Sequence, residues 1–170
     1  MILVYARWGV ALCIGCVIFA NHYSRDTLGA LEKQIEEDMK ISSTQYAHLN
    51  AVYFFPNIFL PLISGILSKK LGASACFLYA CFIAGIGHMI FYLAFVNDRP
   101  EFLFVGRFIS GCMYEVIDSV PILILAPLFT KEWGLICGLL NGFLRLGSVA
   151  NFILCPYFLF IGGKYSSMVH

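Results

Sequence analysis

The stretch FLFVGRFISGCMYEVIDSVPILILAPLF, residues 102–129, decides the fold of this chain. It is a long apolar run in which only Arg107, Glu115 and Asp118 carry a charge. An α-helix needs about 20 predominantly apolar residues to cross the hydrocarbon core of a bilayer. The stretch therefore predicts a transmembrane helix, and its three charged side chains call for an explanation.

The composition extends this prediction to the whole chain. Of its 170 residues, 60% are hydrophobic and 12% are charged, whereas soluble domains are about 45–50% apolar and about 25% charged. These proportions exclude a soluble enzyme and an intrinsically disordered chain. The formal net charge of +1 offers no field for nucleic acid, so we expect the lipid bilayer and no nucleic acid as a partner.

Five apolar runs are separated by short polar segments. Because only helices can satisfy the backbone of such runs in lipid, we expect an all-α, polytopic membrane helix bundle with about five transmembrane helices. Residues 1–170 would form a single transmembrane domain. Leu28, Leu31, Ile35 and Met39 recur with helical spacing and predict an amphipathic helix at the membrane surface. The predicted spans are residues 8–23, 46–67, 73–96, 102–129 and 134–161, and the amphipathic surface segment is residues 27–40.

Basic residues in the short connections predict the orientation of the bundle. Arg7, Lys69, Lys70 and Lys131 lie in very short segments on one side of the predicted membrane. Cytoplasmic loops carry an excess of lysine and arginine. We therefore expect the amino terminus and these four residues on the cytosolic side.

Charged side chains inside the spans are candidates for function, since each costs at least about 2.5–3.5 kcal/mol at the centre of a bilayer. Glu115 and Asp118 are three residues apart and share one helix face. Arg145 lies in the middle of the next, antiparallel span, and counting 1.5 Å per residue places it at a depth similar to that of Glu115. Arg107, near the start of its span, is either an interfacial anchor that snorkels, a packing brace or a functional residue.

Two interpretations of Glu115 and Arg145 follow. They form a structural salt bridge between the two helices, or they line a central cavity and hold a zwitterion. In the second case Glu115 binds an ammonium group, and the fork of Arg145 binds a carboxylate. Polar residues in the same spans favour a cavity. The candidate substrate-binding residues are Glu115, Arg145, Asp118, Asn57, Asn141, Ser148 and Asn151.

No motif indicates catalysis or metal binding. Cys13 and Cys16 have the spacing of a redox or metal pair, but no histidine or second pair lies near them in the sequence. In lipid, cysteines act as small hydrophobic residues. We therefore expect no enzyme activity, no catalytic residue, no metal and no cofactor.

The segment GILSKKLG, residues 65–72, follows the second predicted span. It resembles the G-x-L-a-D-r-x-G signature of the major facilitator superfamily, which lies between the second and third helices of that family, although Lys69 stands where the family has aspartate. Arg107-x-x-x-Gly111 resembles the R-x-x-x-G of the family's fourth helix. The resemblance implies gating or structural roles for Gly65, Lys69, Lys70, Gly72, Arg107 and Gly111.

Four segments together are similar to the lysosomal dipeptide transporter branch of this superfamily, and they are residues 22–39, 56–57, 106–115 and 145–151. This resemblance implies that Glu115 and Arg145 bind the termini of the substrate. It also implies passive or proton-influenced movement of dipeptides or amino-acid-like zwitterions. The expected location is the lysosomal membrane or another endomembrane, with the plasma membrane as an alternative.

Our leading hypothesis is the amino-terminal part of a transporter that works by alternating access, with its site between two related halves. Five spans are one fewer than a six-helix half. We therefore expect a carboxy-terminal half or an accessory subunit to complete the transporter. The alternative is a non-transporting membrane protein that binds or assembles with a partner, in which Glu115 and Arg145 are a structural salt bridge.

Overall fold

The computed structural model describes residues 2–97 and 99–161, and this part of the chain is almost entirely helical. It contains no strand, which confirms the predicted all-α fold. The elements are α1 (Ile2–Ala30), α2 (Glu32–Met39), α3 (Ser43–Phe54), the 3₁₀-helix η1 (Phe55–Ile58), α4 (Leu60–Leu71), α5 (Ala73–Asn97), α6 (Pro100–Leu125) and α7 (Trp133–Ile161).

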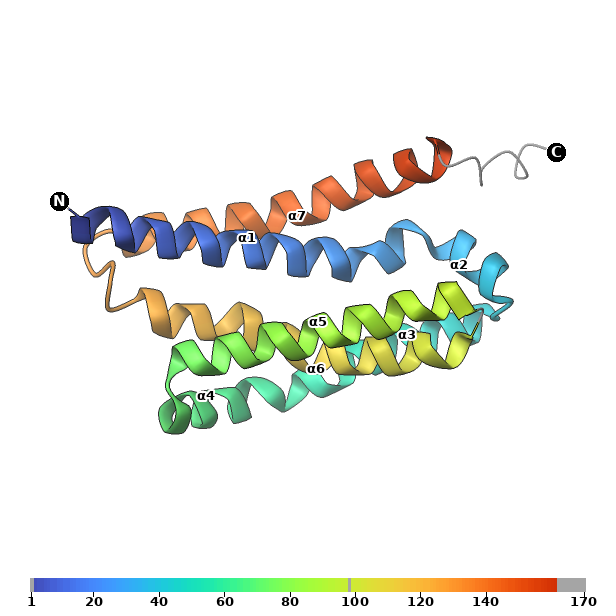
Figure 1. The fold of residues 1–170 in the computed structure, drawn as a ribbon, viewed down its shortest axis with the longest axis horizontal. Helices are drawn as coiled ribbons and strands as arrows, with labels where there is room; N and C mark the ends of the chain where they lie inside the picture. Colours follow the sequence, from blue (N-terminus) through green and yellow to red (C-terminus); the bar gives the residue numbers. More distant parts are fainter. Residues whose placement is uncertain (1, 98, 162–170) are drawn as a thin grey trace.

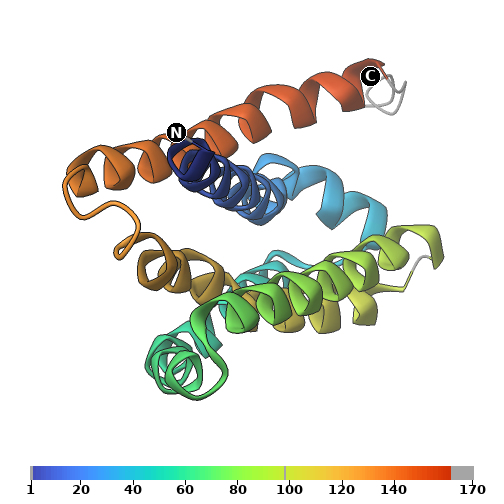
Figure 2. The ribbon, with the colours of Figure 1, turned by 60° about the vertical axis from the view of Figure 1, so that its left-hand side comes forward.

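The long helices lie side by side in two groups (Figures 1 and 2). α1 packs along α7, while α5 and the α3–α4 segment pack against α6. α1 also contacts α6, so these two helices join the groups. The polar residues described below lie where α1, α6 and α7 meet.

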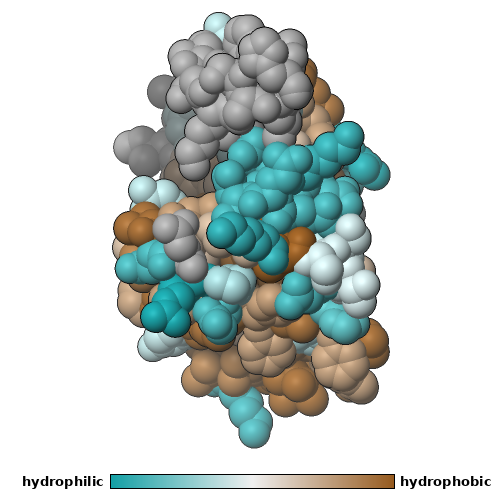
Figure 3. Space-filling view, turned by 90° about the vertical axis from the view of Figure 1, so that its right-hand side faces the viewer, coloured by the Kyte–Doolittle hydropathy of each residue, from teal (hydrophilic) through white to brown (hydrophobic). Residues whose placement is uncertain are grey.

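The four basic residues Arg7, Lys69, Lys70 and Lys131 lie toward one end of the bundle, as the sequence predicts. The start of α1, the α4–α5 turn and the α6–α7 connection lie at one end (Figure 1), which we call the basic end. Arg7 donates a hydrogen bond to Glu132 at 2.9 Å and so ties α1 to the α6–α7 connection. The opposite, acidic end carries α2, and hydrophilic residues gather there (Figure 3).

Three described helices are long and apolar enough to cross a membrane: Ala73–Asn97, Pro100–Leu125 and Trp133–Phe158. The α3–η1 and α4 segments count as a fourth span if taken together, bent by 46°. Pro56 and Pro61 lie at this bend. They explain it, because proline removes a backbone hydrogen bond and cannot continue a straight helix.

α1 extends beyond the predicted end of the first span, from residue 23 to Ala30. Its polar last turns are helical because their side chains bond to α6 and α7. The predicted amphipathic segment is therefore divided between the end of α1 and the short α2. Ile35 and Met39 of α2 are buried with Leu28, Tyr46 and other apolar residues at the acidic end, so helices cover the apolar face of α2.

The outer surface is apolar, as expected for contact with lipid. Along α5, Leu78, Phe82 and Met89 each expose about two thirds of their surface or more (68%, 69% and 70%). Small α5 residues such as Ala80 and Ala84 face inward instead, where they pack with Ile117 and Val120 of α6. In water such a surface would aggregate, so this distribution indicates a bilayer.

Candidate functional site

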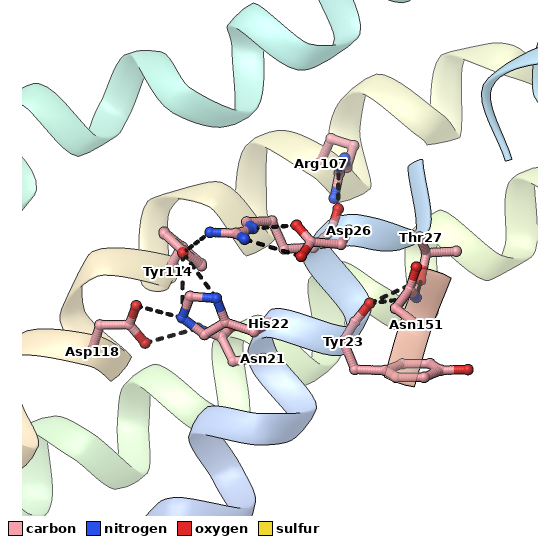
Figure 4. A network of polar contacts seen from close by, with 10 residues as sticks. Asn21, His22, Tyr23, Asp26, Thr27, Arg107, Tyr114, Asp118 and Asn151 are labelled. Atoms are coloured by element: carbon pink, nitrogen blue, oxygen red, sulfur yellow. Dashed lines mark hydrogen bonds and ion pairs between the residues drawn. The ribbon is translucent and has the colours of Figure 1, made fainter. Parts of the chain in front are cut away.

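The last turns of α1 carry a row of polar side chains that face α6 and α7 (Figure 4). Asn21 and His22 are 6% and 2% exposed. Buried polar groups are stable only when hydrogen-bonded. These contacts explain why the chain stays helical here instead of leaving the bundle as a polar loop.

Asp118 of α6 is the acceptor at the centre of this row. His22 Nε2 lies 2.8 Å from Asp118 Oδ2, and Asn21 Nδ2 lies 3.4 Å from Asp118 Oδ1. The Asp118 side chain is 21% exposed, whereas that of His22 is 2% exposed. The pair joins α1 to α6 and leaves part of the carboxylate accessible.

Arg25 and Asp26 form a second ion pair, one turn further along α1. The guanidinium donates two hydrogen bonds to the carboxylate, from Nε to Oδ1 at 2.6 Å and from Nη2 to Oδ2 at 3.0 Å. Arg25 also donates from Nη1 to the Tyr114 hydroxyl, and its guanidinium lies 5.2 Å from the centre of the Tyr114 ring. The two-pronged pair lies within α1 and fixes the orientation of the guanidinium, and the contact of Arg25 with Tyr114 joins α1 to α6.

Arg107 is buried inside the bundle and does not snorkel to the interface. It is 3% exposed, and its Nη2 donates to the carbonyl of Arg25 at 3.0 Å. The guanidinium lies 4.4 Å from the centre of the Tyr53 ring and 5.7 Å from that of Phe91. These aromatic faces attract the cation and keep it inside the bundle.

Asn151 and Ser148 of α7 face α1. Asn151 is fully buried, and its Nδ2 donates to the Tyr23 carbonyl at 2.7 Å and to Thr27 Oγ1 at 2.8 Å. Ser148 lies beside the Asp26 carboxylate. In this conformation Asn151 therefore holds α7 to α1 and has no surface to offer a ligand.

Glu115 and Arg145 do not form the salt bridge of the alternative hypothesis. The ion pairs within the described ranges are Arg7–Glu132, His22–Asp118 and Arg25–Asp26. Glu115 is half-buried and Arg145 is exposed. The charged groups that influence Glu115 are Asp118, His22 and Arg25, all from α1 and α6. Arg145 lies too far from Glu115 for a direct pair.

Their similar depth, however, agrees with the prediction. Asp118 of α6 and Asn141 of α7 line one cavity between α1, α6 and α7. The two helices run in opposite directions (Figure 1). Glu115 lies three residues from Asp118, and Arg145 lies four residues from Asn141, both toward the acidic end. At 1.5 Å per residue, these shifts are about 4.5 and 6 Å.

Asn57 lies at a depth similar to that of Glu115, in the segment that packs against α6 between α3 and α4. Tyr53 of α3 contacts Gly111 of α6, and α3 and α6 both run from the acidic end (Figure 1). Asn57 and Glu115 each follow that contact by four residues, so they lie at about the same level. Both polar atoms of the Asn57 amide are buried and without a hydrogen-bond partner among the described residues.

Comparison with known proteins decides the family. The model of the Major Facilitator Superfamily matches residues 14–169. The chain belongs to this superfamily. It is 28% identical over 146 residues to the lysosomal dipeptide transporter MFSD1 of Mus musculus, and likewise to that of Bos taurus, and 27% identical to that of Homo sapiens. Each match covers 84% of this chain and 31% of the relative. No solved structure matches.

The chain thus spans about a third of the length of these curated relatives. Its superfamily signature, residues 65–72, forms the end of α4 and the turn into α5. Lys69 and Lys70 lie exposed in the last turn of α4. Their positive charges stabilise this end of the helix, which carries the negative end of the helix dipole. Gly72 ends the helix with φ of 87°, a conformation that favours glycine, while Gly65 faces open space.

The second superfamily motif, Arg107 to Gly111, lies at the contact between α6 and α3. A Cβ atom on Gly111 would lie 2.9 Å from Tyr53 Cα and 3.0 Å from Tyr53 C. Only glycine permits this approach. Both ends of the motif therefore contact Tyr53, Arg107 through its ring and Gly111 through its backbone.

Sequence reasoning did not identify His22, Arg25, Asp26 and Tyr114 as a connected site. One signal was available, because Asn21 and Arg25, like His22 and Asp26, have the i, i+4 spacing of one helix face. Ending the first span at residue 23 obscured it. Within the described ranges no group of three or more His, Cys, Asp or Glu side chains could hold a metal ion.

Proposed function

We propose that this chain is the amino-terminal, substrate-binding part of a transporter for small zwitterionic solutes, dipeptides or amino-acid-like compounds. The observation that carries the proposal is the placement of Glu115 and Arg145. They lie at similar depth on α6 and α7, which follow one another in the chain, and neither forms an ion pair with another described residue. An unpaired charge inside a membrane needs water or a ligand.

A zwitterion supplies both missing countercharges. Its ammonium group binds Glu115, and its carboxylate binds the two-pronged guanidinium of Arg145. Two extended residues reach about 7 Å, so a dipeptide bridges charged groups that are too far apart for a direct pair. Asp118, Asn57, Asn141 and Ser148 provide further polar contacts around it.

Transport itself belongs to the complete protein, because the curated relatives are about three times as long as this chain. In the proposed cycle α1 also crosses the membrane, together with the α3–α4 segment, α5, α6 and α7. A second half, or an accessory subunit, covers the site and rocks about it. The gating motif at residues 65–72 lies at the basic end, which we place in the cytosol.

The activity and location of the relatives support the substrate class and the location proposed for this chain. Each of the three proteins compared above is a lysosomal dipeptide transporter. We therefore place this chain in the lysosomal membrane or another endomembrane.

A partner-binding role is the second candidate, and one surface of α7 is compatible with it. Gly138 and Gly142 have no neighbouring atom within 4 Å of where a Cβ would lie. Small residues at membrane helix surfaces allow close packing of another helix. The second half of a transporter would use this surface, and so would an accessory subunit of a protein that does not transport.

Uptake of a labelled dipeptide into proteoliposomes separates these functions. The chain is reconstituted alone and with the carboxy-terminal half of a relative. We expect uptake with the second half, reduced at least about tenfold by Glu115→Gln and by Arg145→Ala, since a hydrogen bond to a charged group contributes about 1.5–3 kcal/mol. Glu132→Gln and Arg99→Ala, outside the site, are the matched controls.

Two results would contradict the transport function. One is unchanged uptake by both site variants, and the other is no uptake with the second half supplied. If the site variants unfold in detergent while the two controls stay folded, a structural role of Glu115 and Arg145 is favoured.

A further inference from the structure

The basic end of the bundle carries lysine side chains that no carboxylate neutralises. Lys69 and Lys70 are exposed in the last turn of α4, and Lys131 is exposed in the α6–α7 connection. None of the three forms an ion pair with another residue of the described ranges. Arg7 differs from them, because it is paired with Glu132. The acidic residue of the α6–α7 connection is therefore already engaged, and the lysine charges remain for an external anion.

The two tryptophans of the chain mark the depth of these lysines in the membrane. Both lie at the basic end, since Trp8 follows Arg7 directly and Trp133 begins α7 two residues after Lys131. Trp8 packs edge-on against Phe129 of the α6–α7 connection, with the ring centres 5.0 Å apart. Tryptophan is enriched where membrane helices enter the headgroup region. The lysines of the same end therefore lie at the level of the phospholipid headgroups.

The side chains around Lys69 and Lys70 suit the apolar part of a lipid. Ile66, Leu67 and Leu71 expose 55%, 41% and 52% of their surface beside the lysine pair. In a bilayer, acyl chains cover such residues, while the long stem of a lysine lets its ammonium group reach the headgroups. The α4–α5 turn thus presents an apolar face next to two cations, as a phospholipid presents acyl chains next to a charged headgroup.

The charges near the turn favour an anionic headgroup. Residues 39–97 contain no aspartate or glutamate, so no acidic residue lies near Lys69 and Lys70 in the sequence. Lys33, at the acidic end, instead lies in α2 among the four carboxylates of residues 32–38, and these repel an anion. Anionic phospholipids of the cytoplasmic leaflet attract basic segments close to the membrane, and the basic end is the one that we expect in the cytosol.

We propose that the α4–α5 turn binds an anionic phospholipid. Lys69 and Lys70 contact its headgroup, and Ile66, Leu67 and Leu71 contact its acyl chains. Lys69 stands where the superfamily signature has aspartate, which would repel such a headgroup, so the site arises from a departure of this chain from the signature. The inference does not depend on which solute is transported.

Native mass spectrometry of the purified chain in detergent measures the affinity for single lipids. Dioleoyl-phosphatidylserine and dioleoyl-phosphatidylcholine have the same acyl chains and differ in the net charge of the headgroup. We expect the wild-type chain to prefer phosphatidylserine. The double variant Lys69→Gln/Lys70→Gln should bind phosphatidylserine about five- to thirtyfold more weakly and phosphatidylcholine as the wild type does, since each lysine near a membrane surface contributes to the attraction of anionic lipid.

Further variants separate the charge from the fold of the turn. Lys70→Gln alone should weaken phosphatidylserine binding by about fivefold, and it keeps the test valid if the double variant fails to fold. Lys69→Asp should weaken binding more than Lys69→Gln, because it adds repulsion. Lys69→Arg/Lys70→Arg keeps both charges and should keep the affinity. The matched control is Lys33→Gln/Lys40→Gln, which removes two exposed lysines at the acidic end and should bind as the wild type does.

The inference is overturned if the folded double variant and Lys70→Gln bind phosphatidylserine as tightly as the wild type, or if the control loses as much affinity. Equal loss in the double arginine variant would contradict the role of charge. Glycerophosphoserine has the same headgroup without acyl chains, and we expect it not to displace the lipid at equal concentration. Complete displacement would indicate a site for soluble phosphate compounds and overturn the lipid assignment. None of these results depends on dipeptide uptake, which tests the proposed function.

Discussion

Replacing Gly111 by alanine tests the packing that brings α3 and α6 together. The added Cβ would lie 2.9 Å from Tyr53 Cα and 3.0 Å from Tyr53 C, and it would also meet the Tyr53 carbonyl oxygen. Carbon atoms prefer separations of about 3.5–4.0 Å. Since all three neighbours are backbone atoms, no rotamer change relieves the clash, and α3 must move by about 0.5–1 Å.

Two opposing effects set the magnitude. Alanine in the middle of a helix is about 0.5–1 kcal/mol more favourable than glycine, while overpacking of this kind costs about 1–3 kcal/mol. Gly85 of α5 provides the matched control, because no atom lies within 4 Å of its Cβ position. The helix-propensity gain is common to both sites, so Gly111→Ala should be about 1–3 kcal/mol less stable than Gly85→Ala.

In a background where the other six cysteines are replaced by alanine, unfolding in detergent can be followed through Cys76, which is 3% exposed and becomes reactive toward a thiol-specific fluorescent dye when the helices separate. We expect Gly85→Ala to unfold at or above the wild-type midpoint and Gly111→Ala below it. The packing argument is refuted if the two variants unfold together, or if Gly111→Ala is the more stable. A Tyr53→Phe variant, which keeps the backbone, should not rescue Gly111→Ala.

Two further predictions concern the ends of the bundle. Ser42→Ala removes the side chain that accepts from the Gln45 backbone at 3.2 Å in the capping box of α3; it should destabilise the start of α3 by about 1 kcal/mol, seen as about fivefold faster hydrogen exchange there. Arg7→Gln breaks the pair with Glu132, whose side chains are 27% and 36% exposed; it should cost about 0.2–1 kcal/mol, and less at high salt. Unchanged exchange at α3, or a larger loss at high salt, would contradict these assignments.

The sequence predicted positions along a helix better than it predicted contacts between helices. The similar depth of Glu115 and Arg145 follows from a regular rise per residue and agrees with the structure. A direct salt bridge between them, one of the two interpretations, is not present, because pairing depends on how far apart α6 and α7 lie and on which faces they turn to each other. The sequence named Asn151 as a candidate substrate-binding residue of the last span, and it is equally silent on the burial of Asn151 against α1.

The end of α1 shows the same limit. Hydropathy ends the first span at residue 23, since Arg25 and Asp26 are expensive in lipid. In the structure these residues form a close pair with each other and contact Tyr114 and Ser148, so the helix continues to Ala30. The charges compensate each other, but the further contacts of the pair come from residues about 90 and 120 positions away, which no local pattern reveals.

By itself, the sequence determined that the chain is a membrane-embedded helix bundle, because in lipid the backbone must satisfy its own hydrogen bonds and the apolar runs have the length of spans. It also identified the few charged residues within the spans as candidates for function. The tertiary structure alone decided how those charges are used: Arg107 and Arg25 brace the bundle, Asp118 pairs with His22, and Glu115 and Arg145 remain unpaired. The physical reason is that the energy of a charge inside a membrane depends on its neighbours in space, and packing of helices distant in sequence chooses those neighbours.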